Sequence, residues 1–223
     1  MKKVALVILS LLIVGFSSLN GQSLNLKIGA FYPIMKSDLW DLNRENLAFG
    51  DADMIGVYWG AEFEIFMGRQ FSLALEAGHY KRDVFTVYKD VVYEDGTPIH
   101  QDFSLRITTI EADFKLYPLG HRKLFNPYIG FGIGLYAWKY YQGGEFVDFE
   151  EEIVYEGEAY TNTITPGFNA KLGFVYRYRR SFGISFEARY IYLKGQLSEL
   201  FEGFGKLDLS SITLNIGVHL FLR

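Results

Sequence analysis

The segment PYIGFGIGLYAWKYY, residues 127–141, decides between the folds open to this chain. Glycine occupies positions 130, 132 and 134, and apolar residues occupy the positions between them. Because alternate side chains of a strand point to opposite faces, one face is wholly apolar and the other combines bare backbone with large aromatic residues. Three glycines on a freely solvated face would only weaken the strand. The glycine face therefore indicates crowded surroundings that need the space.

The first residues have the layout of a secretory signal peptide. Lys2 and Lys3 precede an apolar run over residues 4–16, and small and polar residues follow it. That run is short for a membrane-spanning helix, and cleavage is expected between Gly21 and Ser23. We therefore assign residues 1–22 to a signal peptide and residues 23–223 to one mature domain.

Composition excludes several classes of protein. Without Lys2 and Lys3 the chain has 20 basic and 26 acidic residues, so nucleic acid is not an expected partner. The absence of cysteine excludes disulfides, a lipid-modified N-terminal cysteine and thiolate metal sites. No second apolar run approaches the length of a spanning helix, so any membrane insertion of the mature chain must use strands.

Alternation of apolar and polar residues recurs eight times, without a convincing amphipathic helix or long repeat. Strands are expected at residues 24–32, 54–66, 71–82, 104–117, 127–141, 163–178, 182–194 and 209–222. Short connections at 68–70, 118–126 and 179–181 alternate with long ones near 33–53, 83–103, 142–162 and 195–208. Short periplasmic turns and long external loops are typical of outer-membrane barrels.

The charges follow this division. Of the 26 carboxylates, 20 lie in the four long connections, and the other six lie on strands, all on the face opposite the apolar one. Five basic residues share that face, so it carries both signs of charge. We predict that these side chains form an ion-pair network: Lys27, Glu62, Glu64, Glu76, Glu111, Asp113, Lys115, Lys171, Arg177, Glu187 and Arg189. Within it, Glu62, Glu76, Glu111 and Asp113 are expected to face Lys27 and Lys115 across neighbouring strands.

Alternation alone does not say which face points inward. A soluble lipocalin-like barrel would place the apolar face inside. The interior of an eight-stranded barrel is only just wide enough for side chains, so the three glycines would make room there for Tyr, Glu and Arg side chains from across the lumen. On a soluble barrel they would be holes in a wet surface. We therefore predict an all-β fold, an eight-stranded antiparallel up-and-down transmembrane β-barrel over residues 23–223, with a polar lumen.

Three segments carry a resemblance to known proteins: PYIGFGIGLYAW, SFEARYIYLKG and the closing LDLSSITLNIGVHLFLR. With them the whole mature chain resembles the small outer-membrane β-barrel family of the OmpX, OmpW and OmpA-barrel kind. The resemblance implies the outer membrane of a diderm bacterium, contact with outer-membrane lipids and lipopolysaccharide, and folding by the barrel-assembly machinery. The mature chain is expected to be a monomer. The chain departs from the family pattern in ending on Arg223 rather than on an aromatic residue.

No catalytic or metal site is expected. The four histidines, His79, His100, His121 and His219, have no serine and carboxylate at a triad spacing, and no histidine–carboxylate grouping has metal-ligand spacing. No cofactor is expected either. Lipid A deacylases and palmitoyltransferases use this architecture, so a lipid-modifying enzyme stays an alternative.

Two non-enzymatic functions fit the sequence. The first is a barrel with a largely plugged lumen that displays acidic external loops, with a structural or surface-interaction role. The second is a narrow OmpW-like conduit for small hydrophobic molecules, with Phe85, Val87, Val91 and Val92 as an apolar vestibule. The many side chains expected in the lumen favour the first. The acidic run at 145–158 is typical of a solvated loop, although it could attract cations or a basic ligand.

Four cations fall on the predicted lipid-facing side, each at the long-loop end of its strand: Lys81, Arg106, Lys139 and Lys194. At that depth they would meet lipid head groups, and basic side chains bind phosphate oxygens through charge-assisted hydrogen bonds. We hypothesise a collar for lipopolysaccharide phosphates. The alternative is that the long side chains only lift their charges to the interface.

Overall fold

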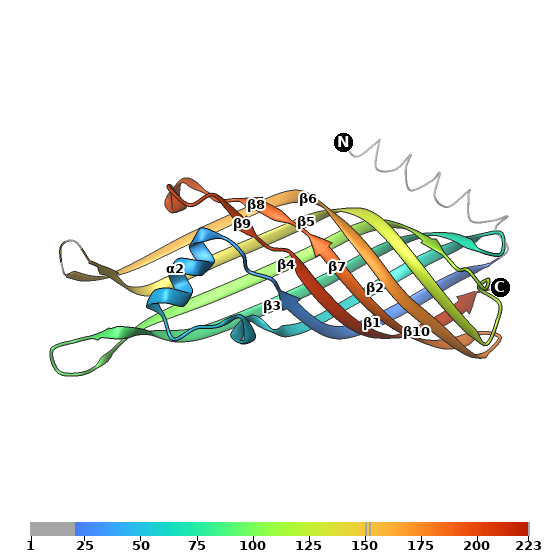
Figure 1. Ribbon diagram of the computed structural model, residues 1–223, viewed down its shortest axis with the longest axis horizontal. Coiled ribbons are helices and arrows are strands. Elements are labelled where there is room, and N and C mark those ends of the chain that lie inside the picture. Colours follow the sequence, from blue (N-terminus) through green and yellow to red (C-terminus); the bar gives the residue numbers. More distant parts are fainter. Residues whose placement is uncertain (1–20, 150, 152, 223) are drawn as a thin grey trace.

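The computed structural model of the chain describes residues 21–149, 151 and 153–222. Eight antiparallel strands close into a barrel in the order β1-β10-β7-β6-β5-β4-β3-β2 (Figure 1), which confirms the predicted fold. The strands of the barrel are β1 (Gln22–Pro33), β2 (Gly56–Met67), β3 (Phe71–Val92), β4 (Pro98–Leu116), β5 (Phe125–Asp148), β6 (Ile153–Arg179), β7 (Phe182–Tyr192) and β10 (Ser211–Leu222). Among the described residues, no helix has the length and apolar character needed to cross a bilayer. The expected signal peptide lies outside the described residues except for Gly21 and Gln22, and its assignment stays a prediction.

Two connections that were predicted as loops are largely strand. Residues 83–92 and 98–103 extend β3 and β4, which stay paired to Val87↔His100 before the register shifts. Residues 142–148 and 153–162 extend β5 and β6, which pair as far as Asp148↔Ile153. The dense carboxylates suggested loops, but a two-stranded hairpin keeps its charges in water as readily as a loop does. The four long strands therefore project well beyond the other four (Figure 1).

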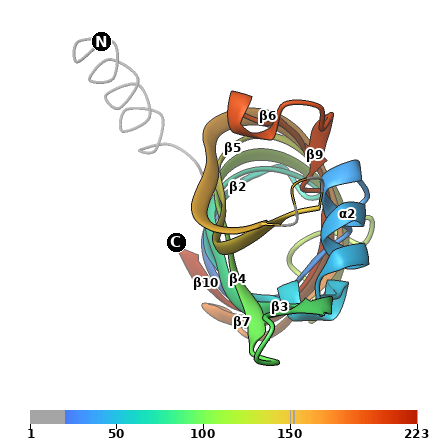
Figure 2. The same ribbon diagram turned by 90° about the vertical axis from the view of Figure 1, so that its left-hand side faces the viewer.

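The other two long connections contain short elements that the sequence analysis did not predict. The first holds the helix α2 (Asp38–Asn46) and the 3-10 helix η2 (Asp51–Met54). The second holds β8 (Lys194–Gln196), η3 (Glu199–Phe201) and β9 (Lys206–Asp208), with β8 and β9 paired to each other. Helix α2 has too few residues for a clear period, but it buries Leu39, Trp40 and Asn43. It lies beside the mouth of the barrel (Figure 2).

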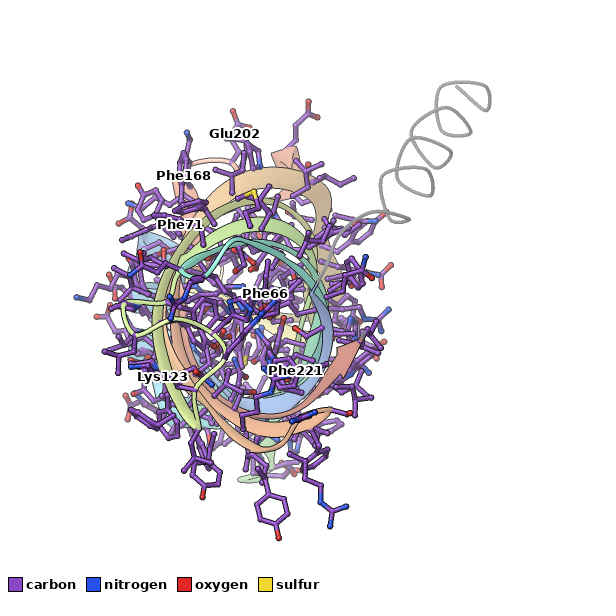
Figure 3. The ribbon with its side chains drawn as sticks, turned by 90° about the vertical axis from the view of Figure 1, so that its right-hand side faces the viewer. Phe66, Phe71, Lys123, Phe168, Glu202 and Phe221 are labelled. Atoms are coloured by element: carbon purple, nitrogen blue, oxygen red, sulfur yellow. The ribbon has the colours of Figure 1, made fainter. Side chains whose placement is uncertain are left out.

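The apolar face of the strands points outward. Ile133, Phe168 and Leu172 are each 63% exposed on the outer wall, whereas the charged face of the strands is buried inside. Figure 3 shows Phe71 and Phe168 projecting from the ring, with Phe66 and Phe221 within it. An apolar band around a closed barrel matches a bilayer. It excludes the lipocalin-like alternative, in which this face would fill the core.

The glycines of β5 make room for charged side chains, as predicted, but these side chains come from the neighbouring strand and not from across the lumen. A Cβ atom at Gly132 would lie 1.9 Å from Oδ1 of Asp113, and one at Gly134 would lie 2.8 Å from Cγ of Glu111. Both acidic residues come from β4, the neighbouring strand. Bare backbone on β5 therefore leaves space for the carboxylates of β4 inside a narrow barrel.

Candidate functional site

A layer of buried charges crosses the middle of the barrel. Glu76 on β3 is its centre: it accepts hydrogen bonds from Lys27 at 2.8 Å, Lys171 at 2.7 Å and Arg189 at 2.9 Å, and from the hydroxyl of Tyr58 at 2.9 Å. These partners come from β1, β6, β7 and β2, so one carboxylate connects five strands. Ten of the predicted network residues lie in this layer and are at most 4% exposed: Lys27, Glu62, Glu64, Glu76, Glu111, Asp113, Lys115, Lys171, Glu187 and Arg189.

The pairing inside the layer differs in part from the prediction. Lys27 and Lys115 both contact Glu62, at 2.8 and 2.5 Å, and Lys27 also contacts Glu76, as expected. Asp113, however, pairs with Lys171 at 2.6 Å. Glu111 instead lies 3.1 Å from Arg189 and 3.4 Å from Lys171. For Asp113 and Lys171 the reason is that β4 and β6 flank β5, whose bare glycines leave room for side chains of the two flanking strands to meet over it.

Arg177 does not join this layer, which corrects its assignment to the network. Its position on β6 has the right parity but lies at the periplasmic mouth, where its guanidinium sits 3.9 Å from the ring centre of Phe221. Glu64 does lie in the lumen, but it is held mainly by hydroxyl groups. It accepts hydrogen bonds from Tyr117 at 2.7 Å, from Ser72 and from Ser23 at 3.4 Å, while Lys115 is 4.0 Å away.

His219 enters the same layer, and the sequence analysis did not group it with carboxylates. Neither of its ring nitrogens has a hydrogen-bond partner among the described residues. Ligand atoms of Glu62, Glu64 and His219 all lie within 4.8 Å of one another. His219 is far in sequence from the two glutamates, and only the pairing of β1 with both β10 and β2 brings them together. The ammonium group of Lys115 lies 2.5 Å from Glu62 and already compensates the negative charge of these carboxylates.

Apolar layers fill the interior above and below the charges. Toward the long hairpins, Trp40 of α2 packs edge-on against Tyr140 at 5.2 Å between ring centres, and Phe49 packs against Phe103 at 5.1 Å. The indole of Trp40 donates a 3.0 Å hydrogen bond to the carbonyl of Asp208, which fixes α2 to β9. At the periplasmic end the smaller cluster consists of Phe66, Tyr117, Tyr128, Val175 and Phe221.

A cleft of about 460 Å³ opens on the external side, between α2, the two long hairpins and η3. Its walls are mostly apolar, with Leu42, Phe146 and Phe204 among them, and its floor carries the amides of Gln101 and Gln142. The two amides are joined by a 2.8 Å hydrogen bond. The predicted vestibule is a different surface, because Phe85, Val87, Val91 and Val92 are not among the lining residues of this cleft. Phe85 is 82% exposed on the outside.

Three of the four predicted collar cations form one row on the outer wall. Lys81 on β3 pairs across the strands with Arg106 on β4, and Arg106 pairs with Lys139 on β5. Lys81 also forms a 2.6 Å ion pair with Asp83. Lys194 is not on β7, as the prediction had it, but on β8, where its ammonium lies 5.8 Å from the ring centre of Tyr192.

No protein-family model and no curated protein sequence matches the chain. Several solved structures, in contrast, match its fold. The outer membrane protein OprG from Pseudomonas aeruginosa aligns with 92% of this chain and 97% of its own length, at 14% identity and a TM-score of 0.53. A major outer membrane protein from Thermus thermophilus aligns with 90% of this chain and 99% of its own, at 11% identity and a TM-score of 0.50. At these identities the likeness concerns the fold, and the chain has the fold of the small outer-membrane β-barrel proteins.

Proposed function

We propose that the protein is an integral outer-membrane barrel with a closed lumen, which acts as a structural and surface-interaction protein rather than as a pore. The observation that supports this is the filling of the interior. Charged side chains that are at most 4% exposed lie between two apolar clusters, and the cluster toward the long hairpins includes Leu39 and Trp40 of α2, the helix beside the mouth. A conducting pore would need a continuous wet path through these layers.

The external hairpins are the surface that would meet a partner. Glu145 and Glu156 face each other on β5 and β6, so like charges lie side by side in the projecting hairpin. Hydrogen bonds from the backbone N–H of His100 at 2.9 Å and from the hydroxyl of Tyr93 at 3.0 Å lower the pKa of Glu145. The hairpin therefore stays acidic at neutral pH, and a basic partner surface would complement it.

Conductance tests this proposal. The refolded protein in planar bilayers is expected to give no stable current steps, and liposomes containing it are expected to retain a small entrapped polar dye. A variant with Trp40→Ala and Tyr140→Ala removes two rings of the upper cluster and serves as a comparison, because it loosens only that layer. Stable current steps or dye release from the parent protein would show that the lumen conducts.

The cation row supports a second part of the proposal, a site for lipopolysaccharide phosphates on the outer wall. Lys81, Arg106 and Lys139 lie side by side, which concentrates positive charge where the long hairpins leave the barrel. Replacing these three and Lys194 with Gln is expected to reduce co-purified lipopolysaccharide. The matched control replaces four exposed cations outside the row: Lys36, Arg69, Lys89 and Lys206. If the collar variant retains as much lipopolysaccharide as the control, the row is not a phosphate site, and its long side chains only extend to place their charges at the membrane–water interface.

The external cleft favours one alternative, binding of a small apolar molecule. Its volume of about 460 Å³ falls in the usual range for small-molecule sites, and a few amides at the floor could orient a ligand. The fluorescent probe N-phenyl-1-naphthylamine is expected to bind saturably to the parent and more weakly to an Ala159→Trp variant, in which the cleft is filled. Uptake of the same probe into liposomes would instead favour the conduit.

A further inference from the structure

The periplasmic end of the barrel carries charge of one sign. The turns at this end and the last residues of β6 contain six cations: Arg69, Arg122, Lys123, Arg177, Arg179 and Arg180. No carboxylate lies in residues 66–72, 116–126 or 176–183. The chain as a whole is acidic, with a formal net charge of −4, so this end differs in sign from the external hairpins. Like charges held together repel one another unless something compensates them.

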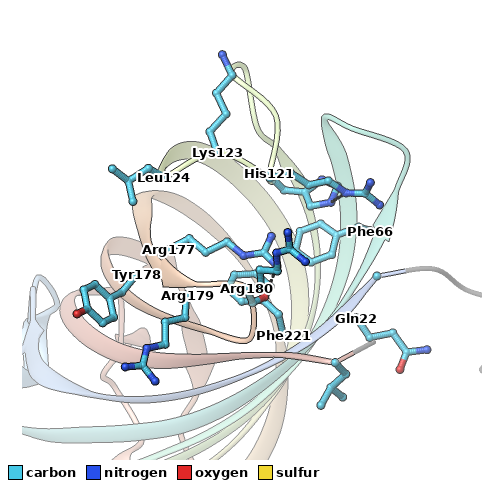
Figure 4. A pocket seen from close by; sticks show the side chains of 13 residues that line it. Gln22, Phe66, His121, Lys123, Leu124, Arg177, Tyr178, Arg179, Arg180 and Phe221 are labelled. Carbon is cyan, nitrogen blue, oxygen red and sulfur yellow. Dashed lines mark hydrogen bonds between the residues drawn. The ribbon is translucent and has the colours of Figure 1, made fainter.

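Five of these cations line a cleft of about 760 Å³ at the barrel mouth (Figure 4). Its floor is aromatic: the guanidinium of Arg177 lies over the ring of Phe221, and the ring of His121 stacks on Phe66 at 4.1 Å between centres. Figure 4 shows Arg177 and Arg180 close to Phe66 and Phe221, whereas Lys123 points away from the mouth. The cleft therefore has cationic side chains around its rim and aromatic rings at its floor.

Local hydrogen bonds hold the walls of the cleft in place. Arg177 donates to the backbone carbonyl of Arg180. Arg122 donates from Nε to Nε2 of His121 at 3.4 Å, and Nδ1 of His121 lies 3.1 Å from the carbonyl of Arg69. This arrangement fits the neutral imidazole, with Nδ1 as the donor. Burial lowers the pKa of His121, and the charges of Arg122 and Arg177 lower it further.

Among the described residues, the cations of the cleft have no acidic partner. None of Arg122, Lys123, Arg177, Arg179 and Arg180 forms an ion pair with any carboxylate of the residues that the structure describes. Every cation of the central layer, in contrast, contacts at least one carboxylate within 3.1 Å. Guanidinium groups present several N–H donors in a fork that matches phosphate oxygens.

We propose that this cleft binds an anion with phosphate-type oxygens, with Arg122, Arg177 and Arg180 as its main ligands. Two sources of such an anion fit the position. Leu124, Tyr178 and Leu222 are exposed beside the cleft and could contact an acyl chain, so the phosphate can belong to an inner-leaflet lipid head group. The cleft also opens toward the aqueous phase, so a soluble phosphate can reach it.

The test compares the parent with a variant that carries Arg122→Gln, Arg177→Gln and Arg180→Gln. A matched control removes the same charge at the external end through Lys36→Gln, Lys89→Gln and Lys206→Gln. All three proteins are refolded in zwitterionic detergent, and heat-dependent gel mobility checks their folding. Calorimetry then measures binding of inorganic phosphate, and native mass spectrometry measures binding of phosphatidylglycerol against phosphatidylcholine.

The parent is expected to bind at least one anionic probe saturably, and the triple variant to bind it about tenfold or more weakly, while the external control binds as the parent does. Preference for phosphatidylglycerol without binding of phosphate identifies a lipid head group as the source. Saturable binding of phosphate alone identifies a soluble source. The proposal is overturned if neither probe binds saturably, or if the external control loses binding as much as the triple variant.

Discussion

Replacing Lys171 with Met should destabilise the barrel by leaving one carboxylate without a cation. Its ammonium lies 2.6 Å from Asp113 and 2.7 Å from Glu76. Glu76 would keep Lys27 and Arg189, whereas Asp113 has no other ion pair among the described residues. Asp113 is 1% exposed, and leaving a buried charge unpaired costs about 3–5 kcal/mol. Met is a flexible side chain of similar length, so the cavity contribution should be small.

A double variant separates charge from packing. Adding Asp113→Asn to Lys171→Met removes the orphaned charge, so the double variant should regain about 2 kcal/mol relative to the sum of the two single variants. Urea unfolding in lipid vesicles, followed by tryptophan fluorescence, gives the free energies. Lys206→Met, at an exposed position of β9, serves as the control and should stay within about 0.5 kcal/mol of the parent. The reasoning is refuted if Lys171→Met matches that control, or if the two substitutions are simply additive.

Three further predictions concern other parts of the barrel. Gly132→Ala places a methyl group 1.9 Å from Oδ1 of Asp113 and should cost about 1–3 kcal/mol in the same urea assay, whereas Gly205→Ala, with nothing within 4 Å, should not. Phe186→Arg, on the outer wall, should cost about 2–4 kcal/mol in vesicles and weaken the heat-dependent gel shift, and an unchanged shift would contradict a lipid-facing position. Because the folded-state pKa of His121 is lowered, its contribution to stability is full above its ordinary pKa of about 6.5 and is lost as pH falls below that value. The midpoint of thermal unfolding should therefore fall more steeply from pH 7 to 5 in the parent than in His121→Gln, and equal slopes would argue against a desolvated imidazole.

Much of the barrel wall could be predicted because alternation is a local property. The face of each strand follows from parity, so Ile133 and Phe186 were placed on the lipid side and Glu76 in the lumen from sequence alone. The strand ends were not predictable in the same way. Residues 83–88 alternate in burial as β3 continues, but the charges of this segment look the same in a loop and in a hairpin that projects into water. Helix α2 is recognisable only from what Trp40 contacts, since nine residues give no firm period.

Which side chains enter the lumen could largely be predicted, but which of them form ion pairs with one another could not. Parity placed Arg177 on the inner face, but the height of a residue in a barrel depends on register and strand tilt, which put Arg177 at the mouth. The same geometry pairs Asp113 with Lys171 from β6 instead of a residue from a neighbouring strand. His219 reaches Glu62 and Glu64 only because the first and last strands meet.

The meeting of those two strands has a consequence for the order in which the barrel is assembled. β1 and β10 are paired along their whole length, from Gln22↔Leu222 to Pro33↔Ser211, so the closing interface joins opposite ends of the described chain. The contact between Lys27 and Glu187 crosses the same seam. Contacts so distant in sequence form slowly, because the entropy of closing the intervening chain must be overcome first. An unclosed sheet would expose two unpaired edges at which other chains can add. The period before closure is therefore when the chain most needs a chaperone.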